Sequence, residues 1–232
     1  MVNSQMSNKT LCDECGKETD NCVREKTDFC SALYQCEDCF KLSQSSQVVD
    51  QRIQINKRAA EVIKKMLPTK YHSIETDYQE MLEKYEDKNI FIYGDVGRGK
   101  TVFMSSMLKR CAHAGLDVMW LSYTSFIMKL QNCFAKENKG ETAYDEAQRI
   151  ARFNGVLFID DLGAEKLTDF VRQITYYILN EREQWMGRTV ITSNFSLDEI
   201  DTLIDRRVSS RICGMCEIVS FSRGKDRRKE KP

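Results

Sequence analysis

The segment from Asn89 to Thr101 constrains the fold of this chain more than any other. A short apolar run ending at Tyr93 is followed directly by Gly-Asp-Val-Gly-Arg-Gly-Lys-Thr, which is the strand, glycine-rich turn and helix start of a P-loop. Glycines let backbone N–H groups approach a polyphosphate, and a helix that begins at the loop directs its positive dipole end at the same charge. The pattern therefore predicts a site for ATP or GTP between a strand and a helix.

The residue types in this loop give its members distinct expected roles. Lys100 is expected to reach the β- and γ-phosphates, and the Thr101 hydroxyl is an expected ligand of Mg²⁺. The predicted nucleotide-binding residues of the loop are Gly94, Asp95, Val96, Gly97, Arg98, Gly99, Lys100 and Thr101.

Length and composition favour one α/β domain with a small appendage. A chain of 232 residues can hold a domain of about 150 to 190 residues, but not two large cores. Its longest apolar stretch falls well short of the roughly 20 residues that cross a bilayer, so a cytoplasmic protein without membrane contact is expected. In that compartment ten cysteines favour metal binding or free thiols over disulfides. With 35 basic and 35 acidic side chains, overall attraction to nucleic acid is not indicated.

Strands and helices are expected to alternate along most of the chain. Expected strands are 89–93, 117–122, 156–160, 188–193 and 217–222, and expected helices are 50–66, 74–85, 102–114, 125–136, 141–153, 168–186 and a short one begun by a capping box at Ser196. Strands separated by helices predict a parallel five-stranded sheet, with the phosphate site at the carboxyl ends of its strands.

Polar residues follow two further strands at that same edge. Asp160 and Asp161 end the apolar run that begins at Val156, and Asn194 ends the strand that begins at Arg188. Asp160 is expected to hold Mg²⁺, and Asp161 to orient or deprotonate the attacking water. Asn194 is expected to bond the γ-phosphate or that water, although Asn is also common in turns.

Six of the ten cysteines lie between Cys12 and Cys39, before a polar linker at 42–47. Two Cys-x-x-Cys pairs separated by 20 residues have the spacing of a four-cysteine zinc ribbon. The predicted Zn²⁺ ligands are Cys12, Cys15, Cys36 and Cys39. Cys22 and Cys30 are possible replacements, ligands of a second partial site, or free thiols.

In their order along the chain, these motifs resemble those of one ATPase family. The motifs are the P-loop, Phe-Ile-Asp-Asp-Leu-Gly, Thr-Ser-Asn, the segment from Asp205 to Ile212 and a final Gly-Lys-Asp-Arg-Arg. They are similar to the motifs of the AAA+ ATPases of the DnaC/DnaI helicase loaders and the related IstB transposition ATPases. The resemblance covers about residues 68 to 228. It implies a three-layer α/β AAA+ sandwich at 68–232, after a zinc-ribbon-like docking domain at 1–45 and a helical linker at 46–67.

The same resemblance implies roles for single residues. Asp160 and Asp161 match the Walker B acids, and Asn194 matches sensor 1. Arg211 matches the arginine finger supplied to a neighbouring subunit, and Arg228 the sensor 2 arginine, while Arg207 is a weaker candidate for the finger. Asp161 stands where many AAA+ enzymes have Glu, so slow hydrolysis is expected.

The implied function is an ATP-controlled loader that binds a hexameric replicative helicase, delivers it onto single-stranded DNA and assembles into a spiral or ring. The acidic residues 1–45 favour a protein partner over DNA. Two alternatives stay open: an IstB-like transposition regulator, and a nucleotide-gated adaptor with little hydrolysis. A contact with single-stranded DNA could come from Phe126, Lys129, Phe134, Arg149 and Arg152, although aromatic residues at helical spacing are more often in the core.

Overall fold

The computed structural model describes residues 46–74, 78–135, 142–163 and 168–221, together with the backbone of four short strands between residues 10 and 36. The chain divides into two compact units, Met1–Ala60 and Glu61–Pro232. Among the described residues, no helix has both the length and the apolar character needed to span a bilayer.

The first unit contains two small antiparallel sheets. Strand β1 (Thr10–Leu11) pairs with β2 (Glu18–Thr19), and β3 (Cys22–Glu25) pairs with β4 (Leu33–Cys36) in a register that sets Cys22 opposite Cys36. The helix expected at 50–66 is confirmed as α2 (Ser46–Met66), which begins in this unit.

The zinc prediction falls almost entirely outside these elements. Only the backbone is described for Cys22 and Cys36. The other predicted or possible ligands lie outside the described residues: Cys12, Cys15, Cys30 and Cys39. The zinc ribbon therefore stays a prediction.

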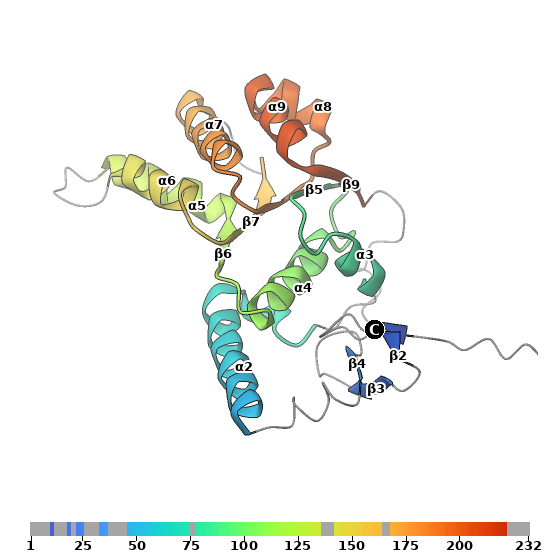
Figure 1. Ribbon diagram of the computed structural model, residues 1–232. Coiled ribbons are helices and arrows are strands. Elements are labelled where there is room, and N and C mark those ends of the chain that lie inside the picture. The colour runs from blue at the N-terminus through green and yellow to red at the C-terminus, as the bar shows by residue number, and fades with distance from the viewer. Residues whose placement is uncertain are drawn as a thin grey trace, which may run out of the picture. The chain divides into compact units, whose positions relative to one another are not determined.

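The second unit is built on a parallel sheet, as predicted. Its strands run in the order β6-β7-β8-β5-β9, and all four neighbouring pairs are parallel (Figure 1). The strands are β5 (Ile90–Tyr93), β6 (Val118–Ser122), β7 (Val156–Leu162), β8 (Thr189–Ser193) and β9 (Glu217–Ser220).

Helices cover both faces of this sheet, so the unit has three layers. Figure 1 shows α4 on one side and α7, α8 and α9 on the other. The helical elements are η1 (Thr69–Tyr71), α3 (Gln79–Lys84), α4 (Lys100–His113), α5 (Tyr123–Ala135), α6 (Ala143–Ala151), α7 (Asp169–Gln184), α8 (Leu197–Leu203) and α9 (Arg206–Met215). The central strands are mostly apolar because both of their faces are buried, and most of their polar residues lie towards the carboxyl ends of β7 and β8.

The helix after the P-loop ends as its sequence predicts. Gly115 has a φ of 78°, its N–H donates to Ala112, and the next N–H, of Leu116, donates to Cys111. These two bonds form a Schellman motif, in which glycine avoids the strain that a side chain would have at positive φ. The motif directs the chain from α4 back towards the sheet and into β6.

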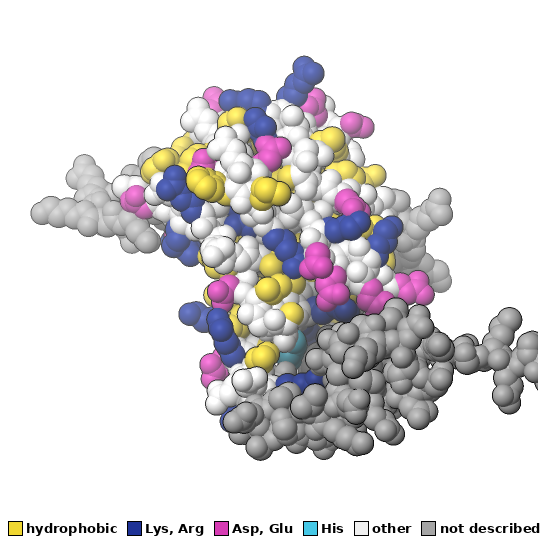
Figure 2. Space-filling model, viewed as in Figure 1, with side chains coloured by type: hydrophobic (Ala, Val, Ile, Leu, Met, Phe, Trp, Pro, Cys, Tyr) yellow, Lys and Arg dark blue, Asp and Glu magenta, His cyan; other side chains and the backbone are white. Residues whose placement is uncertain are grey.

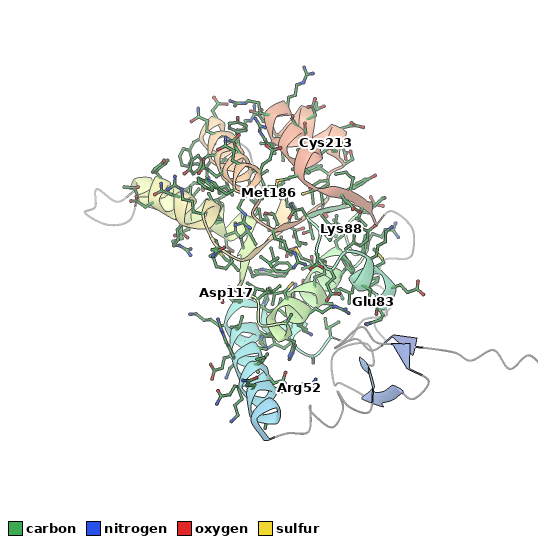
Figure 3. The ribbon with its side chains drawn as sticks, in the orientation of Figure 1. Arg52, Glu83, Lys88, Asp117, Met186 and Cys213 are labelled. Atoms are coloured by element: carbon green, nitrogen blue, oxygen red, sulfur yellow. The ribbon has the colours of Figure 1, made fainter. Side chains whose placement is uncertain are left out.

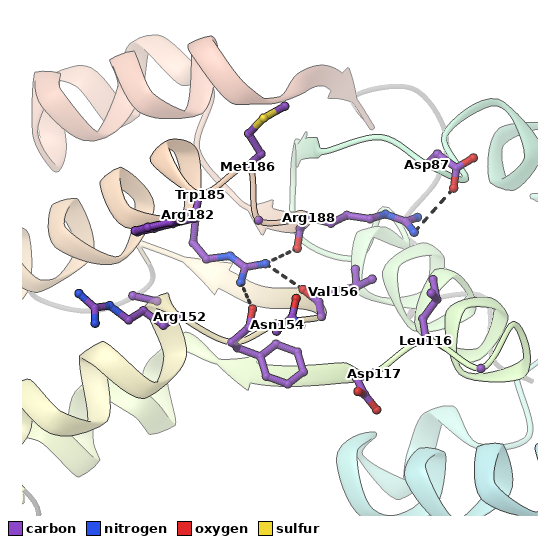
Figure 4. Close-up of a pocket in the computed structure, with 15 residues that line it drawn as sticks. Asp87, Leu116, Asp117, Arg152, Asn154, Val156, Arg182, Trp185, Met186 and Arg188 are labelled. Carbon is purple, nitrogen blue, oxygen red and sulfur yellow. Dashed lines mark hydrogen bonds and ion pairs between the residues drawn. The ribbon is translucent and has the colours of Figure 1, made fainter.

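A fully buried arginine connects the amino-terminal ends of two strands. The Arg182 side chain is 1% exposed, and its guanidinium donates to the carbonyls of Phe153, Gly155 and Arg188 (Figure 4). It also donates to the Thr189 hydroxyl at 3.1 Å. Burial lowers the pKa of Arg182 to about 10, so it remains charged at neutral pH. This cluster lies at the edge of the sheet opposite the P-loop, beside a cavity of about 920 Å³.

Contacts at the surface also join distant segments. Lys88, which is labelled in Figure 3, lies just before β5 and donates to Glu217 at the start of β9. Elsewhere, the half-buried Tyr78 packs edge-on against the buried Phe103 of α4 with ring centroids 5.4 Å apart, and Phe221 contacts both rings. The ring contacts hold the segments just before α3 and just after β9 against α4.

Candidate nucleotide-binding site

The P-loop connects β5 to α4 with a backbone that only glycine adopts easily. Gly94, Gly97 and Gly99 have φ values of 141°, 81° and 90°, and Gly99 is the residue that caps the start of α4. Positive φ at these positions strains any residue with a side chain. The three glycines are therefore required by the path of the loop as well as by the space that a phosphate needs.

Lys100 is the first residue of α4, and its side chain folds back over this loop. Its ammonium donates to the carbonyls of Gly94, at 2.6 Å, and Asp95, at 2.9 Å, and to the side-chain oxygen of Asn194, at 2.8 Å. Only 5% of Lys100 is exposed. The structure thus brings Asn194, at the end of β8, to the P-loop lysine, as expected from the parallel sheet.

Asp160 near the end of β7 lies against the next P-loop residue. The hydroxyl of Thr101 donates to Asp160 Oδ1 at 3.0 Å, and the hydroxyl of Thr192 donates to the same oxygen at 2.7 Å. Burial and the neighbouring charge of Asp161 raise the pKa of Asp160, against the opposing effects of the two hydroxyls and of Lys70. A buried carboxylate beside a threonine hydroxyl is the arrangement expected at a Mg²⁺ site.

Asp161 has an unusual backbone conformation for a residue other than glycine. Its φ is 58°, and its N–H donates to the Thr192 hydroxyl at 3.0 Å. Thr192 therefore contacts both acids, which the sequence analysis missed, because a threonine inside a strand is ordinary. The available signal was a polar residue in an otherwise apolar buried strand, two positions before Asn194.

Arg211 lies on α9, where it contacts α7. Its guanidinium donates to Glu183 at 2.7 Å and makes a long contact of 3.5 Å with the Tyr176 hydroxyl. Arg207 lies above the same ring, 4.8 Å from its centroid, and bonds Asp205. The structure therefore places Arg211 at a partly exposed helical surface, in contact with an acid. Arg228 lies outside the described residues.

One of the two aromatic residues considered for stacking on DNA is buried. Phe126 is 3% exposed and belongs to the core, as is more usual for aromatic residues at helical spacing, so it cannot stack on a base. Lys129 and Arg149 both pair with Glu146, at 3.0 and 2.8 Å. In the face shown in Figure 2, basic and acidic side chains are interspersed over the described part of the chain. The side chain of Phe134 is outside the description.

The residues of the site fit a nucleoside triphosphate with Mg²⁺. The loop offers backbone N–H groups and an ammonium to the phosphates, while Thr101 and Asp160 offer two oxygen ligands. Magnesium usually keeps several waters and takes only one or two carboxylates together with phosphate oxygens. In the described residues there is no group of three or more His, Cys, Asp and Glu side chains that could hold a metal.

Known proteins match this part of the chain. Residues 80–231 match the family of the IstB-like ATP binding protein. The replicative helicase loader DnaI of Bacillus subtilis (strain 168) is 28% identical over 119 residues, which are 51% of this chain and 37% of that protein. The chain thus matches well under half of the length of this relative.

Solved structures share the fold. A crystal structure of DnaI has a TM-score of 0.54 and 17% identity, with 72% of this chain and 93% of that chain covered. The DnaC helicase loader has a TM-score of 0.52 and 22% identity, covering 66% and 94%, and AMPPCP-bound DnaA from Aquifex aeolicus has 0.55 and 20%, covering 70% and 53%. The family match covers about two thirds of the chain and contains the P-loop, both acids of β7 and the end of β8; the chain belongs to the IstB-like ATP-binding protein family.

Proposed function

We propose that this protein is an ATP-dependent helicase loader, which binds a replicative DNA helicase and delivers it onto single-stranded DNA under the control of ATP binding and hydrolysis. The observation that carries the proposal is the convergence of Lys100, Thr101, Asp160 and Asn194 at one edge of the sheet, inside the region that matches the family. The similarity to a protein named as a replicative helicase loader supplies the biological role.

In this proposal the P-loop holds the triphosphate and the acids act on the water. Lys100 exchanges its carbonyl partners for phosphate oxygens, and Asn194, already bonded to that ammonium, lies within reach of the γ-phosphate. Thr101 and Asp160 hold Mg²⁺, which neutralises charge on the phosphates when it is bound. Asp161 orients the attacking water. The shorter reach of Asp compared with Glu makes hydrolysis slow.

Arg211 is proposed as an arginine finger that acts on the nucleotide of a neighbouring subunit. Its contacts in the described chain are with Glu183 and Tyr176 of α7, and its side chain is partly exposed. A guanidinium delivered in trans completes the neutralisation of charge in phosphoryl transfer, so hydrolysis occurs only in the assembled spiral or ring. Arg228 is proposed as the sensor 2 arginine.

Replacing Arg211 with alanine is expected to leave ATP affinity unchanged and to lower hydrolysis in the assembled protein by roughly 10³-fold, because only the transition-state charge loses its partner. Single-turnover phosphate release measures the loss. Arg207→Ala is the comparison, since Arg207 contacts the same tyrosine ring from the same helix. Hydrolysis at the wild-type rate by Arg207→Ala is expected, and a loss in Arg207→Ala alone would assign the finger to Arg207. An Arg211→Ala protein with the wild-type rate excludes the finger.

Mixing two inactive variants tests whether the finger acts between subunits. Arg211→Ala keeps its own acids, and Asp161→Asn keeps its arginine, so a mixed assembly contains some complete sites. Hydrolysis by the mixture should exceed that of either variant alone. If the mixture stays as inactive as its components, Arg211 does not act in trans.

The amino-terminal residues are proposed to dock the helicase. In this proposal residues 1–45 form a zinc-binding module with Cys12, Cys15, Cys36 and Cys39 as ligands, residues 46–67 form a helical linker, and residues 68–232 form the ATPase. The acidic charge of the module, increased by four thiolates, disfavours contact with DNA phosphates and suits a protein surface. Contact with single-stranded DNA is proposed only for the assembled form, with strong salt dependence.

A loading assay with the full chain tests the function. The protein and a candidate replicative helicase are mixed with ATP, passed over a sizing column, and then supplied with circular single-stranded DNA, on which loaded helicase is counted. A stable complex and ATP-dependent loading are expected, with Lys100→Ala as the inactive control. A complex that forms without any loading supports the nucleotide-gated adaptor, and the absence of any complex contradicts the loader.

A further inference from the structure

We propose that Thr192 is a positioning residue for the two acids of β7, and that its hydroxyl determines how well the protein holds Mg²⁺ beside the nucleotide. This inference rests on the nucleotide site proposed above. It concerns a residue that acts through Asp160 and Asp161.

An irregularity in the sheet places Thr192 opposite both acids. The parallel register pairs Ile159 with Ile191 and then Leu162 with Ser193. Two residues of β7, Asp160 and Asp161, therefore face the single residue Thr192 of β8. Such a bulge takes its extra residue out of the ladder and is common beside active sites, where it changes the direction of a side chain.

The Thr192 hydroxyl satisfies the main-chain N–H of Asp161 at the bulge and also bonds the Asp160 side chain. It donates to Asp160 Oδ1 at 2.7 Å and accepts from the N–H of Asp161 at 3.0 Å, so one hydroxyl uses its single hydrogen and a lone pair on consecutive residues. Thr192 is fully buried, which leaves no room for water to replace it. The backbone of Asp161, at a φ of 58°, is stabilised by this bond.

Asp160 is held from two sides as a result. Thr101 approaches from α4 and Thr192 from β8, and both hydroxyls bond the same oxygen, Oδ1. Among the described residues no hydrogen bond to Oδ2 is seen, so this oxygen can accept from a metal-bound water. Groups that orient a metal ligand in this way typically change metal affinity or activity by about 10- to 100-fold when they are removed.

Two substitutions at this position separate the hydroxyl from the shape of the side chain. Thr192→Val keeps the β-branched shape and removes the hydroxyl, and Thr192→Ser restores the hydroxyl. Thr189→Val is the matched control. Thr189 is a buried threonine of the same strand whose hydroxyl accepts from Arg182 at 3.1 Å, at the opposite edge of the sheet.

The measurement is the Mg²⁺ concentration that gives half-maximal binding of a fluorescent ATP analogue, with the affinity in EDTA measured beside it. Thr192→Val is expected to need about 10- to 100-fold more Mg²⁺ and to bind as the wild type does in EDTA. Thr192→Ser and Thr189→Val should keep the wild-type Mg²⁺ dependence. Thermal unfolding of all three variants checks that each is folded.

The inference is overturned if Thr192→Val has the wild-type Mg²⁺ dependence, if it loses affinity equally in EDTA, or if Thr192→Ser fails to restore the dependence. If Thr192→Val does not fold, Thr192→Ser and Thr189→Val are compared with the wild type. The inference is then overturned if both variants depart from the wild-type Mg²⁺ dependence by the same amount, because the effect is not specific to position 192. A wild-type protein whose nucleotide binding ignores Mg²⁺ contradicts the proposed nucleotide site itself. Wild-type Mg²⁺ dependence with an unaffected Thr192→Val contradicts only the role of Thr192.

Discussion

Lys100→Ala is expected to weaken ATP binding severely. The ammonium of Lys100 is the buried positive charge at the P-loop, where it bonds two carbonyls and Asn194 at 2.6 to 2.9 Å. Truncating one partner of a buried, charged hydrogen bond costs about 2 to 5 kcal/mol, which is at least roughly a 30-fold loss of affinity. Isothermal titration with Mg²⁺ and a nonhydrolysable ATP analogue measures the loss.

The chain contains a close control for this substitution. Lys109 is a second lysine of α4 that is also 5% exposed, and its ammonium donates to the carbonyls of His72 and Ile74 at 2.8 and 3.0 Å. Lys109→Ala should lower stability and leave ATP affinity within about twofold of the wild type, because these contacts are away from the P-loop. Retention of wild-type affinity by Lys100→Ala would remove the basis for the nucleotide site.

Arg182→Ala is expected to lower the free energy of unfolding by about 3 to 5 kcal/mol. The guanidinium satisfies three main-chain carbonyls and the Thr189 hydroxyl, and each buried group left without a partner costs roughly 1 to 3 kcal/mol. Water from the adjacent cavity would recover part of the loss. Arg182→Lys should recover only part as well, since an ammonium lacks the planar fork that reaches the ends of both strands. Urea denaturation followed by circular dichroism gives the difference.

An exposed arginine beside the same cavity is the matched control. Arg152 has 58% of its side chain exposed and pairs with Glu181 at 3.5 Å. An exposed pair of this kind contributes little, so Arg152→Ala should change stability by less than about 1 kcal/mol. Equal effects of the two substitutions would show that the carbonyl contacts of Arg182 do not stabilise the fold.

Helix and strand limits show where local sequence is sufficient. The end of α4 was predicted because Gly115 accepts a left-handed conformation, and the start of α8 because Ser196 and Glu199 form a capping box. Helix α6 is shorter than expected and starts after Thr142, which forms a capping box with Asp145. The sequence contains this Thr-x-x-Asp pattern, but a capping box more commonly has Glu or Gln in place of Asp, so the pattern does not by itself indicate the start of the helix.

Strand β7 shows where local sequence is not sufficient. It was expected to end at Asp160 and instead runs to Leu162, because the bulge opposite Thr192 lets the pairing with β8 resume after the two acids. A bulge depends on the register between strands that are about 30 residues apart, and no pattern within either strand specifies it.

The sequence by itself determined the P-loop, the alternation of helices and strands that makes the sheet parallel, and the gathering of Lys100, Asp160 and Asn194 at one edge. These follow from local rules, because parallel strands with helical crossovers present their carboxyl ends on the same side. Only the tertiary structure decided that Thr192 contacts both acids and that Arg211 contacts Glu183. It also decided that Arg182 joins the amino-terminal ends of β7 and β8. Each of these contacts depends on strand order, register and helix packing between distant segments. The hydrogen bonds that stabilise it form only in the folded chain, so no local sequence pattern predicts it.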